Sequence, residues 1–489
     1  MLNRRNLESW RAAACAGALS LALGLAGCSD SAPQVTDQSR RWLAGDHHIH
    51  SQFSLTYDSS GEEPVPVLRG HGIYPIPHNA VMAQHFGLDW MVSTDHGGRA
   101  HARISLEEAY PTLLIARQAV PELIHYYGVE LNPPGADHAS VIVPRSADEA
   151  DQIFMVESQF DRVNGPGRPP LEPDADSESR MLEALEFMQT LPEKPVVIAN
   201  HPARTANDDG FGRTGAAELR QWNDTAPDIA IGMEGSPGHQ AAGLMPERYP
   251  KRPLLRGNYP RIPTRGGFDL MTAELGGVWD SMLGEGRGWW ITGTSDSHRH
   301  WSEGGNDFWP GEYSKTYVYA SKTYSGILQS LREGRVFVTT GDLISELELS
   351  VAAEGAAAAI GDRLEVGAGS DMQVTIRVRD PSAANANGDN PSVARVDLIA
   401  GNVDPALIAA AGDINPGTGV VRRFTEADWA RDGEYLSMTH ELADVRDAIY
   451  LRVRGTSTDE LEPEPDLIDE DPWQDLWFYS NPVFVLVSR

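Results

Sequence analysis

Short apolar runs alternate with longer amphipathic stretches between Asp46 and about Gly341. The apolar runs have the length of buried strands, and the stretches between them repeat with the period of a helix. We expect strands at 90–93, 124–129, 139–143, 196–199, 229–233 and 290–292. We expect helices at 78–86, 106–119, 179–190, 216–222, 271–283 and 325–332. Strands that alternate with helices predict βα units, and hence a parallel sheet or barrel.

After Gly341 the pattern changes to an alternation of apolar and polar residues with a period of two. The strands expected here are 347–351, 373–378, 396–400, 435–440, 449–453 and 483–487. The turns between them are rich in Gly, Asn, Asp and Pro, which predicts a small all-β sandwich. The acidic segment 459–475 is either a solvated loop or a calcium site, and it lacks the spacing of an ordered calcium loop.

Three long turn-rich segments interrupt the first region, at 53–77, 202–215 and 236–267. Loops of this length in a compact domain are typical of lids and substrate walls, and they also serve as linkers. The third segment is basic, in a chain whose formal net charge is −30. Its basic residues, which either attract an anionic substrate or balance charge, are Lys251, Arg252, Arg256, Arg261 and Arg265.

The first 28 residues have the pattern of a signal peptide. Three arginines precede an Ala/Leu-rich stretch at 12–26, which is too short for a comfortable membrane span. The stretch ends in Leu-Ala-Gly-Cys, which resembles a bacterial lipobox in which Cys28 becomes the lipidated N-terminus. We therefore expect a lipid-anchored protein on the periplasmic or extracellular face of the envelope. The alternative is an ordinary secretion signal with an incidental cysteine.

These patterns predict four consecutive parts: a signal peptide with lipobox at 1–28, a tether at 29–45, a β/α barrel at 46–341 and a β-sandwich-like domain at 342–489. The other cysteine, Cys15, lies in the signal, so no thiolate remains as a metal ligand. The strongly negative charge disfavours a nucleic-acid-binding face, because phosphate backbones attract Lys and Arg. No nucleic-acid partner is expected, and the oligomeric state stays open.

Histidines and carboxylates follow several of the expected strands. His48 and His50 are two residues apart, so on an extended segment they project from the same face. A buried, unpaired Glu130 would be costly, and a bound metal would remove that cost. Asp46 is placed to fix the tautomer of a neighbouring imidazole. The motifs are Asp46-His47-His48-Ile49-His50, Thr94-Asp95-His96, Glu130, His138, His201 and Ser295-Asp296-Ser297-His298. Ligands of this kind suit zinc, manganese or iron.

In this order the motifs resemble those of the PHP (polymerase and histidinol phosphatase) superfamily of metal-dependent hydrolases. The matching pattern is His-x-His, Thr-Asp-His, a strand-end Glu, His-Pro and Asp-x-His, between Asp46 and His298. The resemblance implies a distorted seven-stranded β/α barrel with two or three clustered divalent metal ions. The tail after Tyr479-Ser480-Asn481-Pro482 is similar to that of secreted PHP proteins of the carbaryl-hydrolase type.

The resemblance also implies which residues bind each metal. For the first metal they are His48, His50, Glu130 and Asp296. Glu130 would bridge to a second metal, whose other ligands are His138 and His201. A third metal would be bound by His96 and His298. The last ligand of the third metal is not defined by the pattern, and the candidates are Asp58, His71 and His78.

Clustered metals activate a bridging hydroxide for attack at phosphorus or carbon. We therefore expect a phosphoesterase for a small anionic substrate, or alternatively a hydrolase of carboxylic or carbamic esters or amides. A non-catalytic envelope-binding protein is a third hypothesis. Asp95, His96 or His298 would protonate the leaving group. Arg99 and Arg204, each three residues after a proposed ligand, would bind a phosphate or carboxylate.

Overall fold

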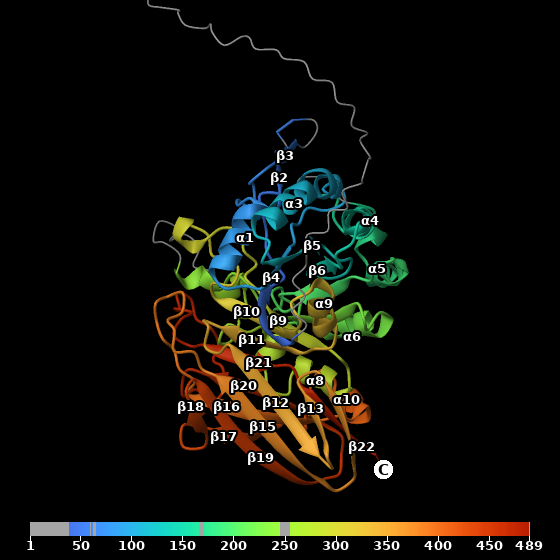
Figure 1. Ribbon diagram of the computed structural model, residues 1–489. Helices are drawn as coiled ribbons and strands as arrows, with labels where there is room; N and C mark the ends of the chain where they lie inside the picture. The colour runs from blue at the N-terminus through green and yellow to red at the C-terminus, as the bar shows by residue number, and fades with distance from the viewer. Residues whose placement is uncertain (1–38, 59, 62–64, 166–170, 245–254, 489) are drawn as a thin grey trace, which may run out of the picture. The chain divides into compact units, whose positions relative to one another are not determined.

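A computed structural model describes residues 39–58, 60–61, 65–165, 171–244 and 255–488 (Figure 1). The predicted signal peptide, the lipobox Cys28 and nearly all of the predicted tether lie outside these residues, as do Lys251 and Arg252. Among the described residues, no helix combines the length and the apolar character that crossing a bilayer requires.

Seven strands lie side by side in one mixed sheet. Their order is β1 (Arg41–Asp46), β4 (Trp90–Ser93), β5 (Ile124–Leu131), β6 (His138–Val143), β7 (Val196–Asn200), β8 (Ala230–Ser236) and β9 (Trp290–Gly293). The pairs are parallel, except that β6 runs antiparallel to both β5 and β7. The short turn between β5 and β6 explains this exception, because a parallel pair needs a longer crossover. The sheet is thus mixed, whereas the sequence predicted a parallel one.

The expected barrel is not confirmed, because the sheet has two ends. Beyond their strands, β1 and β9 are linked by one isolated parallel bridge between Ile49 and Ser297, where the His50 N–H donates to the Ser297 carbonyl over 3.0 Å. Within the described residues, β1 uses its second edge to pair antiparallel with β10 (Ser314–Ala320). That edge is therefore not free to form a ladder with β9.

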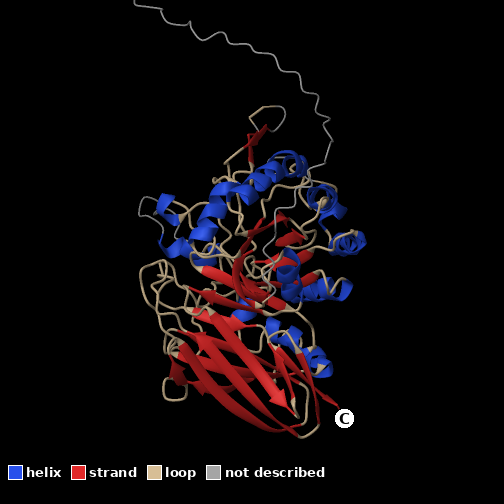
Figure 2. Cartoon of the chain, in the orientation of Figure 1, coloured by secondary structure: helices blue, strands red, loops and turns tan. Residues whose placement is uncertain are grey.

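Helices surround this part of the sheet (Figures 1 and 2). They are α1 (Ile76–His85), α2 (Ala102–Ile104), α3 (Tyr110–Ala119), α4 (Glu149–Phe160), α5 (Glu178–Thr190), α6 (Ala216–Thr225), α7 (Leu270–Ala273), α8 (Val278–Gly284) and α9 (Tyr324–Arg332). The sequence patterns did not predict α4. They predicted one helix at 271–283, but the chain forms α7 and α8, because Gly276 adopts a φ of 78° that interrupts a helix.

The same sheet continues into the C-terminal region through β10 and β11 (Val336–Thr340). Next come β21 (Trp477–Ser480), β20 (Ile449–Thr456), β22 (Val483–Ser488) and β14 (Arg363–Gly367), while β16 (Arg395–Asn402) and β17 (Gly419–Phe424) branch from β20. β11 pairs with both β10 and β21, so the sheet runs across the predicted boundary at residue 341. The chain from Asp37 to Arg489 forms one compact unit. The two-domain division stays a prediction.

A separate five-stranded antiparallel sheet faces this C-terminal part. Its strands are β13 (Ala356–Ala359), β12 (Glu346–Ala353), β15 (Ser370–Arg379), β19 (Tyr435–Val445) and β18 (Ala430–Asp432). Alternate residues of β12 and β15 are buried, as the period of two predicted. They share one apolar core with β16, β20 and β22, which gives the region a sandwich-like arrangement. Two smaller elements are the helix α10 (Pro405–Ala411) and a hairpin of β2 (Thr56–Asp58) and β3 (Val65–Val67).

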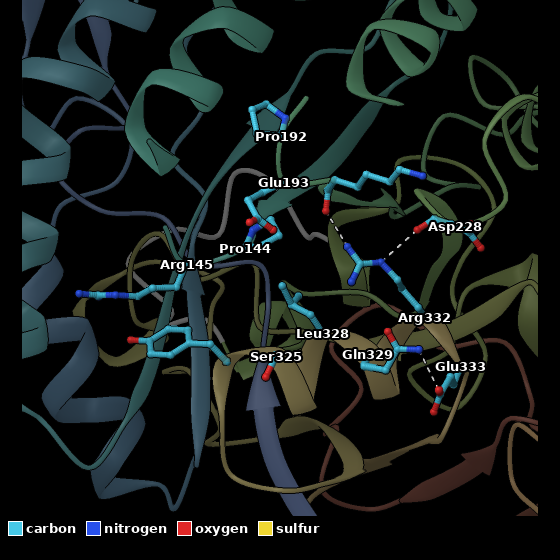
Figure 3. Close-up of a pocket in the computed structure, with 12 residues that line it drawn as sticks. Pro144, Arg145, Pro192, Glu193, Asp228, Ser325, Leu328, Gln329, Arg332 and Glu333 are labelled. Atoms are coloured by element: carbon cyan, nitrogen blue, oxygen red, sulfur yellow. Dashed lines mark hydrogen bonds between the residues drawn. The ribbon is translucent and has the colours of Figure 1, made fainter. Parts of the chain in front are cut away.

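A cavity of about 700 Å³ lies at the edge where β7 and β8 begin (Figure 3). Arg332 of α9 spans this edge, and its guanidinium donates to the carbonyls of Lys194 and Asp228 over 2.6 and 3.2 Å. Arg332 thereby connects α9 to the segments that precede β7 and β8. Among the described residues that line this cavity, none is a predicted site residue. The predicted site residues gather at the opposite edge.

Candidate metal centre

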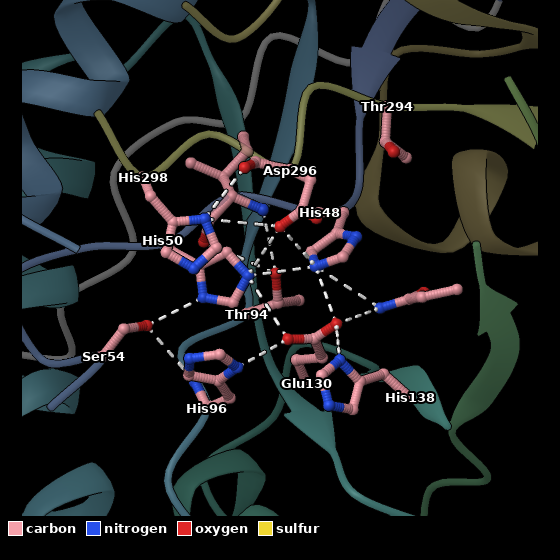
Figure 4. Close-up of polar contacts among 12 residues, drawn as sticks. His48, His50, Ser54, Thr94, His96, Glu130, His138, Thr294, Asp296 and His298 are labelled. Atoms are coloured by element: carbon pink, nitrogen blue, oxygen red, sulfur yellow. Dashed lines mark hydrogen bonds and ion pairs between the residues drawn. The ribbon is translucent and has the colours of Figure 1, made fainter. Parts of the chain in front are cut away.

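The predicted ligands lie together because each one lies at, or within a few residues of, a strand end at the same edge of the sheet (Figure 4). His48 and His50 follow β1, His201 follows β7, and Asp296 and His298 follow β9. Glu130 lies near the end of β5. His138 begins β6, which is antiparallel, so its first residue meets the last residues of its parallel neighbours. Motifs that are far apart in the sequence are therefore close together in the fold.

Glu130 is the centre of the cluster and is buried. Among the described residues, five imidazoles have a nitrogen within 3.4 Å of its carboxylate: His48, His50, His96, His138 and His201. Oε1 faces His48, His138 and His201, whereas Oε2 faces His50 and His96. One carboxylate thus has its two oxygens in two different groups of nitrogen donors. This is the arrangement expected of a bridging ligand.

Asp296 completes the donor set around the first His pair. Its Oδ1 lies 3.1 Å from the Nε2 atoms of both His48 and His50, which are themselves 3.0 Å apart. Despite these short contacts, Asp296 Oδ1 has the geometry of a hydrogen bond with no described residue, and His298 Nε2 is likewise buried without a hydrogen-bond partner among them. Buried polar atoms are normally satisfied, and a cation between these atoms would satisfy them. The residues present therefore fit a divalent metal ion.

The protonation states of His50, His298 and Glu130 favour the same interpretation. Burial lowers the pKa of His50 to about 3, and burial also holds the pKa of His298 well below its ordinary value. These imidazoles are consequently neutral and offer a lone pair, which is the form that binds a metal. Burial alone would raise the pKa of Glu130, but nearby His138 and His48 hold it well below its ordinary value. The carboxylate is therefore ionised at neutral pH.

Of the three candidates for the last ligand of the third metal, His71 lies next to His96 and His298. Its Nδ1 lies 2.6 Å from His96 Nε2, the two rings stack with an interplanar angle of 7°, and its ring centroid is 4.4 Å from that of His298. The two other candidates lie elsewhere: Asp58 is exposed in β2, and His78 stacks on Trp309. His71, His96 and His298 therefore form the third group of donors.

Two further carboxylates, those of Glu234 and Asp137, contact the predicted ligands. Glu234, which the sequence analysis missed, lies 2.7 Å from His48 Nδ1 and accepts from the His201 N–H over 2.7 Å. Asp137 Oδ2 lies 3.2 Å from His201 Nδ1. Glu234 ends an apolar strand just as Glu130 does, so the same signal could have identified it.

Asp46 acts differently from the expectation. The sequence analysis assigned it to an imidazole, but its carboxylate accepts the backbone N–H groups of His48 and Ser295 over 3.0 and 3.1 Å. It thus joins the segment after β1 to the segment after β9, and Glu234 is the carboxylate that orients the His48 ring. The short i to i+2 reach of an aspartate favours the backbone contact.

Two ligands occupy strained backbone conformations. His201 has a φ of 31° and Asp296 a φ of 45°, in the left-handed region that non-glycine residues rarely adopt. Such strain persists only where the surroundings enforce it, and it clusters at functional sites. Here the Glu234 carboxylate holds the His201 N–H, and a contact to His239 holds Asp296.

A cavity of about 640 Å³ opens onto this cluster of predicted metal ligands, and we call it the metal-facing cavity. Its lining includes His71, His96, Glu130, His138, Asp296 and His298, together with Arg204. Arg204 lies 3.5 Å from Asp137 and 3.7 Å from Asp296, so its guanidinium is part of the site. His239, which the sequence analysis missed, also lines the cavity and lies between Asp296 (2.8 Å) and Asp307 (2.5 Å). Although burial opposes it, these carboxylates raise the pKa of His239 to about 10.

Two predicted catalytic residues are placed away from this cavity. Asp95 accepts from the Ser51 N–H over 2.5 Å and from the hydroxyls of Ser51 and Ser54, so its carboxylate holds the loop after β1. Ser54 in turn lies 2.8 Å from His50 Nδ1. Arg99 donates to the Asp161 carbonyl over 2.8 Å and lines a different cavity. Neither is among the described residues that line the metal-facing cavity.

Comparison with known proteins gives little further information. No family model matches the chain, and no curated protein matches it. A search of solved structures finds the "Crystal structure of Endonuclease Q complex with 27-mer duplex substrate with an abasic lesion at the active site". The identity is 13%, the TM-score is 0.26, and the match covers 60% of this chain and 56% of that one. The match spans little more than half of that chain's length, and at this similarity it carries no argument about fold or function.

Proposed function

We propose that the protein is a metal-dependent hydrolase of the PHP type, and that it hydrolyses phosphate esters. The observation that carries the proposal is Glu130, a buried carboxylate whose two oxygens face separate groups of imidazoles. Donor atoms within 4.8 Å of one another form overlapping groups: His48, His50 and Glu130; His96, Glu130 and His138; and His50, His96 and His298. Zinc, manganese and iron all suit such nitrogen and oxygen donors.

The proposed ligands follow from these contacts. His48, His50, Glu130 and Asp296 would hold one ion, Glu130 with His138 and His201 a second, and His71, His96 and His298 a third. Bound divalent ions would supply a water of lowered pKa and would neutralise the charge that develops on the ester oxygens.

The remaining side chains of the cavity bind and position the substrate. Arg204 is the guanidinium that faces the ligands, and its planar donors suit a phosphate oxygen pair. Where the third metal position is unfilled, His96, which is partly exposed in the cavity wall, would be the group that protonates the leaving-group oxygen. The same arrangement also accommodates a carboxylic or carbamic ester, since a tetrahedral centre with a developing negative oxygen forms in that case too.

The proposal extends to the location of the protein. The N-terminal sequence supports a lipid anchor at Cys28 on the outer side of a bacterial membrane. The net charge of −30 supports a small-molecule substrate over a nucleic acid.

Purified protein assayed with manganese or zinc tests the proposal, with phosphate esters and carboxylic esters run in parallel. We expect turnover of the phosphate esters and loss of activity and of bound metal in Glu130→Gln. The matched control is Glu108→Gln, an exposed glutamate of the helical segment Ser105–Ala109, which should behave as wild type. Full activity in Glu130→Gln would refute the bridging role. Turnover of carboxylic esters alone would refute the phosphoesterase assignment.

A further inference from the structure

A loop from the C-terminal region reaches the metal-facing cavity. Ile468, which follows β20 in the sequence and precedes β21, lines the cavity together with Leu255, Tyr259 and Pro260. These residues form an apolar wall in a cavity whose other described lining residues are mainly imidazoles, carboxylates and Arg204. A mostly apolar wall beside a few convergent polar groups is typical of small-molecule sites.

The loop is fixed in place by backbone contacts to the segment at 255–268. The Asp466 N–H donates to the Thr264 carbonyl over 2.8 Å, and the Gly266 N–H donates to the Glu464 carbonyl over 3.2 Å. The buried Asp466 carboxylate accepts from the Gly267 N–H over 3.0 Å and from the Thr264 hydroxyl over 2.5 Å. Ile468 therefore lies two residues after Asp466, which these hydrogen bonds hold in place.

A buried arginine fixes the other end of the loop. Arg256 Nη1 lies 2.8 Å from Asp475 and 3.4 Å from both Asp466 and Glu470. The three carboxylates could otherwise hold a metal ion, but the guanidinium lies among them. Much of the acidic segment is exposed, and its carboxylates at Asp466, Glu470 and Asp475 surround a guanidinium. The acidic segment is a partner of the basic segment.

Ile468 is 50% exposed even though its loop is fixed at both ends. A fixed loop cannot fold this side chain inward, so its apolar surface stays in water until a ligand covers it. Burial of that surface favours a ligand with an apolar group, in proportion to the area removed from water. The metal-facing residues and the apolar wall are parts of one cavity, so a single molecule can contact both.

We infer that Ile468, Leu255 and Pro260 form a subsite for the apolar organic group of the substrate, and that the loop at 466–470 determines substrate specificity. The inference rests on the proposed function. The substrate class is a small ester with an alkyl or aryl group, whose ester centre faces the metal ligands and whose organic group covers Ile468. In the reaction, water adds its oxygen to phosphorus, the P–O bond to the organic group breaks, and the released alcohol takes a proton.

Kinetics with methyl, butyl and phenyl phosphate test the inference through release of inorganic phosphate. In the wild type, kcat/KM should rise from the methyl to the phenyl ester. Ile468→Ala should lower kcat/KM for phenyl phosphate by about tenfold, mainly through KM, because it removes three carbons of the contact. The methyl ester should change by less than about twofold, since its organic group does not reach the wall. Leu255→Ala should show the same selective loss.

Two variants serve as controls. Ile468→Leu keeps the apolar volume and should retain the preference for the phenyl ester. Leu467→Ala changes a neighbour that is 70% exposed and is not among the described residues lining the cavity, so it should behave as wild type. Equal losses for all three esters in Ile468→Ala, or a similar loss in Leu467→Ala, would assign Ile468 to the stability of the loop and overturn the inference.

A binding measurement separates this inference from the proposed function. Phenylphosphonate and methylphosphonate are not hydrolysed, and calorimetry gives their affinities without turnover. If no ester is hydrolysed, the proposed function fails. The subsite is still supported if the wild type prefers phenylphosphonate and Ile468→Ala loses that preference. If the wild type shows no preference for the apolar group in either assay, the subsite is overturned.

Discussion

Arg256→Met would remove the guanidinium that lies among the carboxylates of Asp466, Glu470 and Asp475. Asp466 and Asp475 are buried, and Glu470 is partly exposed. Removing one partner of a buried ion pair costs about 3–5 kcal/mol, because the remaining charge is left desolvated. Asp475, whose carboxylate lies 2.8 Å from the guanidinium, contributes most of this cost. The substitution also removes the hydrogen bond of 2.9 Å that Arg256 donates to the Tyr313 hydroxyl. We therefore expect the free energy of unfolding to fall by about 4 kcal/mol.

Urea unfolding followed by tryptophan fluorescence measures this loss, because Trp473 and Trp477 lie in the same region. The control is Arg261→Met, an exposed arginine of the same segment, which should change stability by less than about 0.5 kcal/mol.

The loss should also depend on pH, with a definite sign. In the wild type, burial and the neighbouring carboxylates raise the pKa of Asp475 to about 7, although Arg256 opposes this. A carboxyl whose folded pKa is raised lowers the stability of the fold as pH rises from its unfolded pKa, 3.8, toward its folded pKa of about 7. Without the guanidinium the pKa rises further, so the deficit of Arg256→Met should be largest above pH 7 and should shrink toward pH 5. A deficit below about 1 kcal/mol, or one independent of pH, would refute the argument.

Two further predictions concern the third metal group and a distant helix. His71→Ala should lower the metal affinity of one site by at least about tenfold in equilibrium dialysis, because it removes a donor. His78→Ala, the control, should bind metal as the wild type does. Equal metal content in the two variants would exclude His71 as a ligand. Burial and nearby Glu218 raise the pKa of the half-buried Glu178 to about 7, so its ionisation costs stability as pH rises from about 4.5 to 7. Glu178→Gln should thus be more stable than the wild type at pH 8 by up to about 1 kcal/mol after solvent screening, with no gain at pH 4 in thermal unfolding; a gain at pH 4 would contradict the assignment.

The sequence predicted the metal-facing strands well because their patterns are local. The runs that became β4, β6 and β7 are continuous apolar segments, and their boundaries agree with the expected ones to within a residue. Three of the predicted ligands lie at these strands: His96 follows β4, His138 begins β6 and His201 follows β7. β1, which precedes His48 and His50, was not predicted. Nor were β10 and β11 predicted, since their alternating polar residues become buried only when distant partners join them.

His71 shows why one ligand could not be chosen from the sequence. It lies in a long turn-rich segment whose path is set by non-local contacts: the Gln52 N–H donates to Tyr74, and the Ile73 N–H donates to the His298 carbonyl. Gly72 allows this path, because a Cβ there would lie 2.1 Å from the Ser51 carbonyl oxygen. No periodicity in the sequence encodes such a close approach.

The pairing of the first strand has a consequence for how the protein is made. β1 immediately precedes His48 and His50, and its Arg41 pairs with Ala320 of β10. During synthesis the first two proposed metal ligands therefore emerge long before the strand that pairs with β1. Pairings between such distant segments slow folding, because the closure of a long loop precedes any gain from contact. We expect the ions to be captured late, by a nearly complete chain, and so in the compartment where folding finishes.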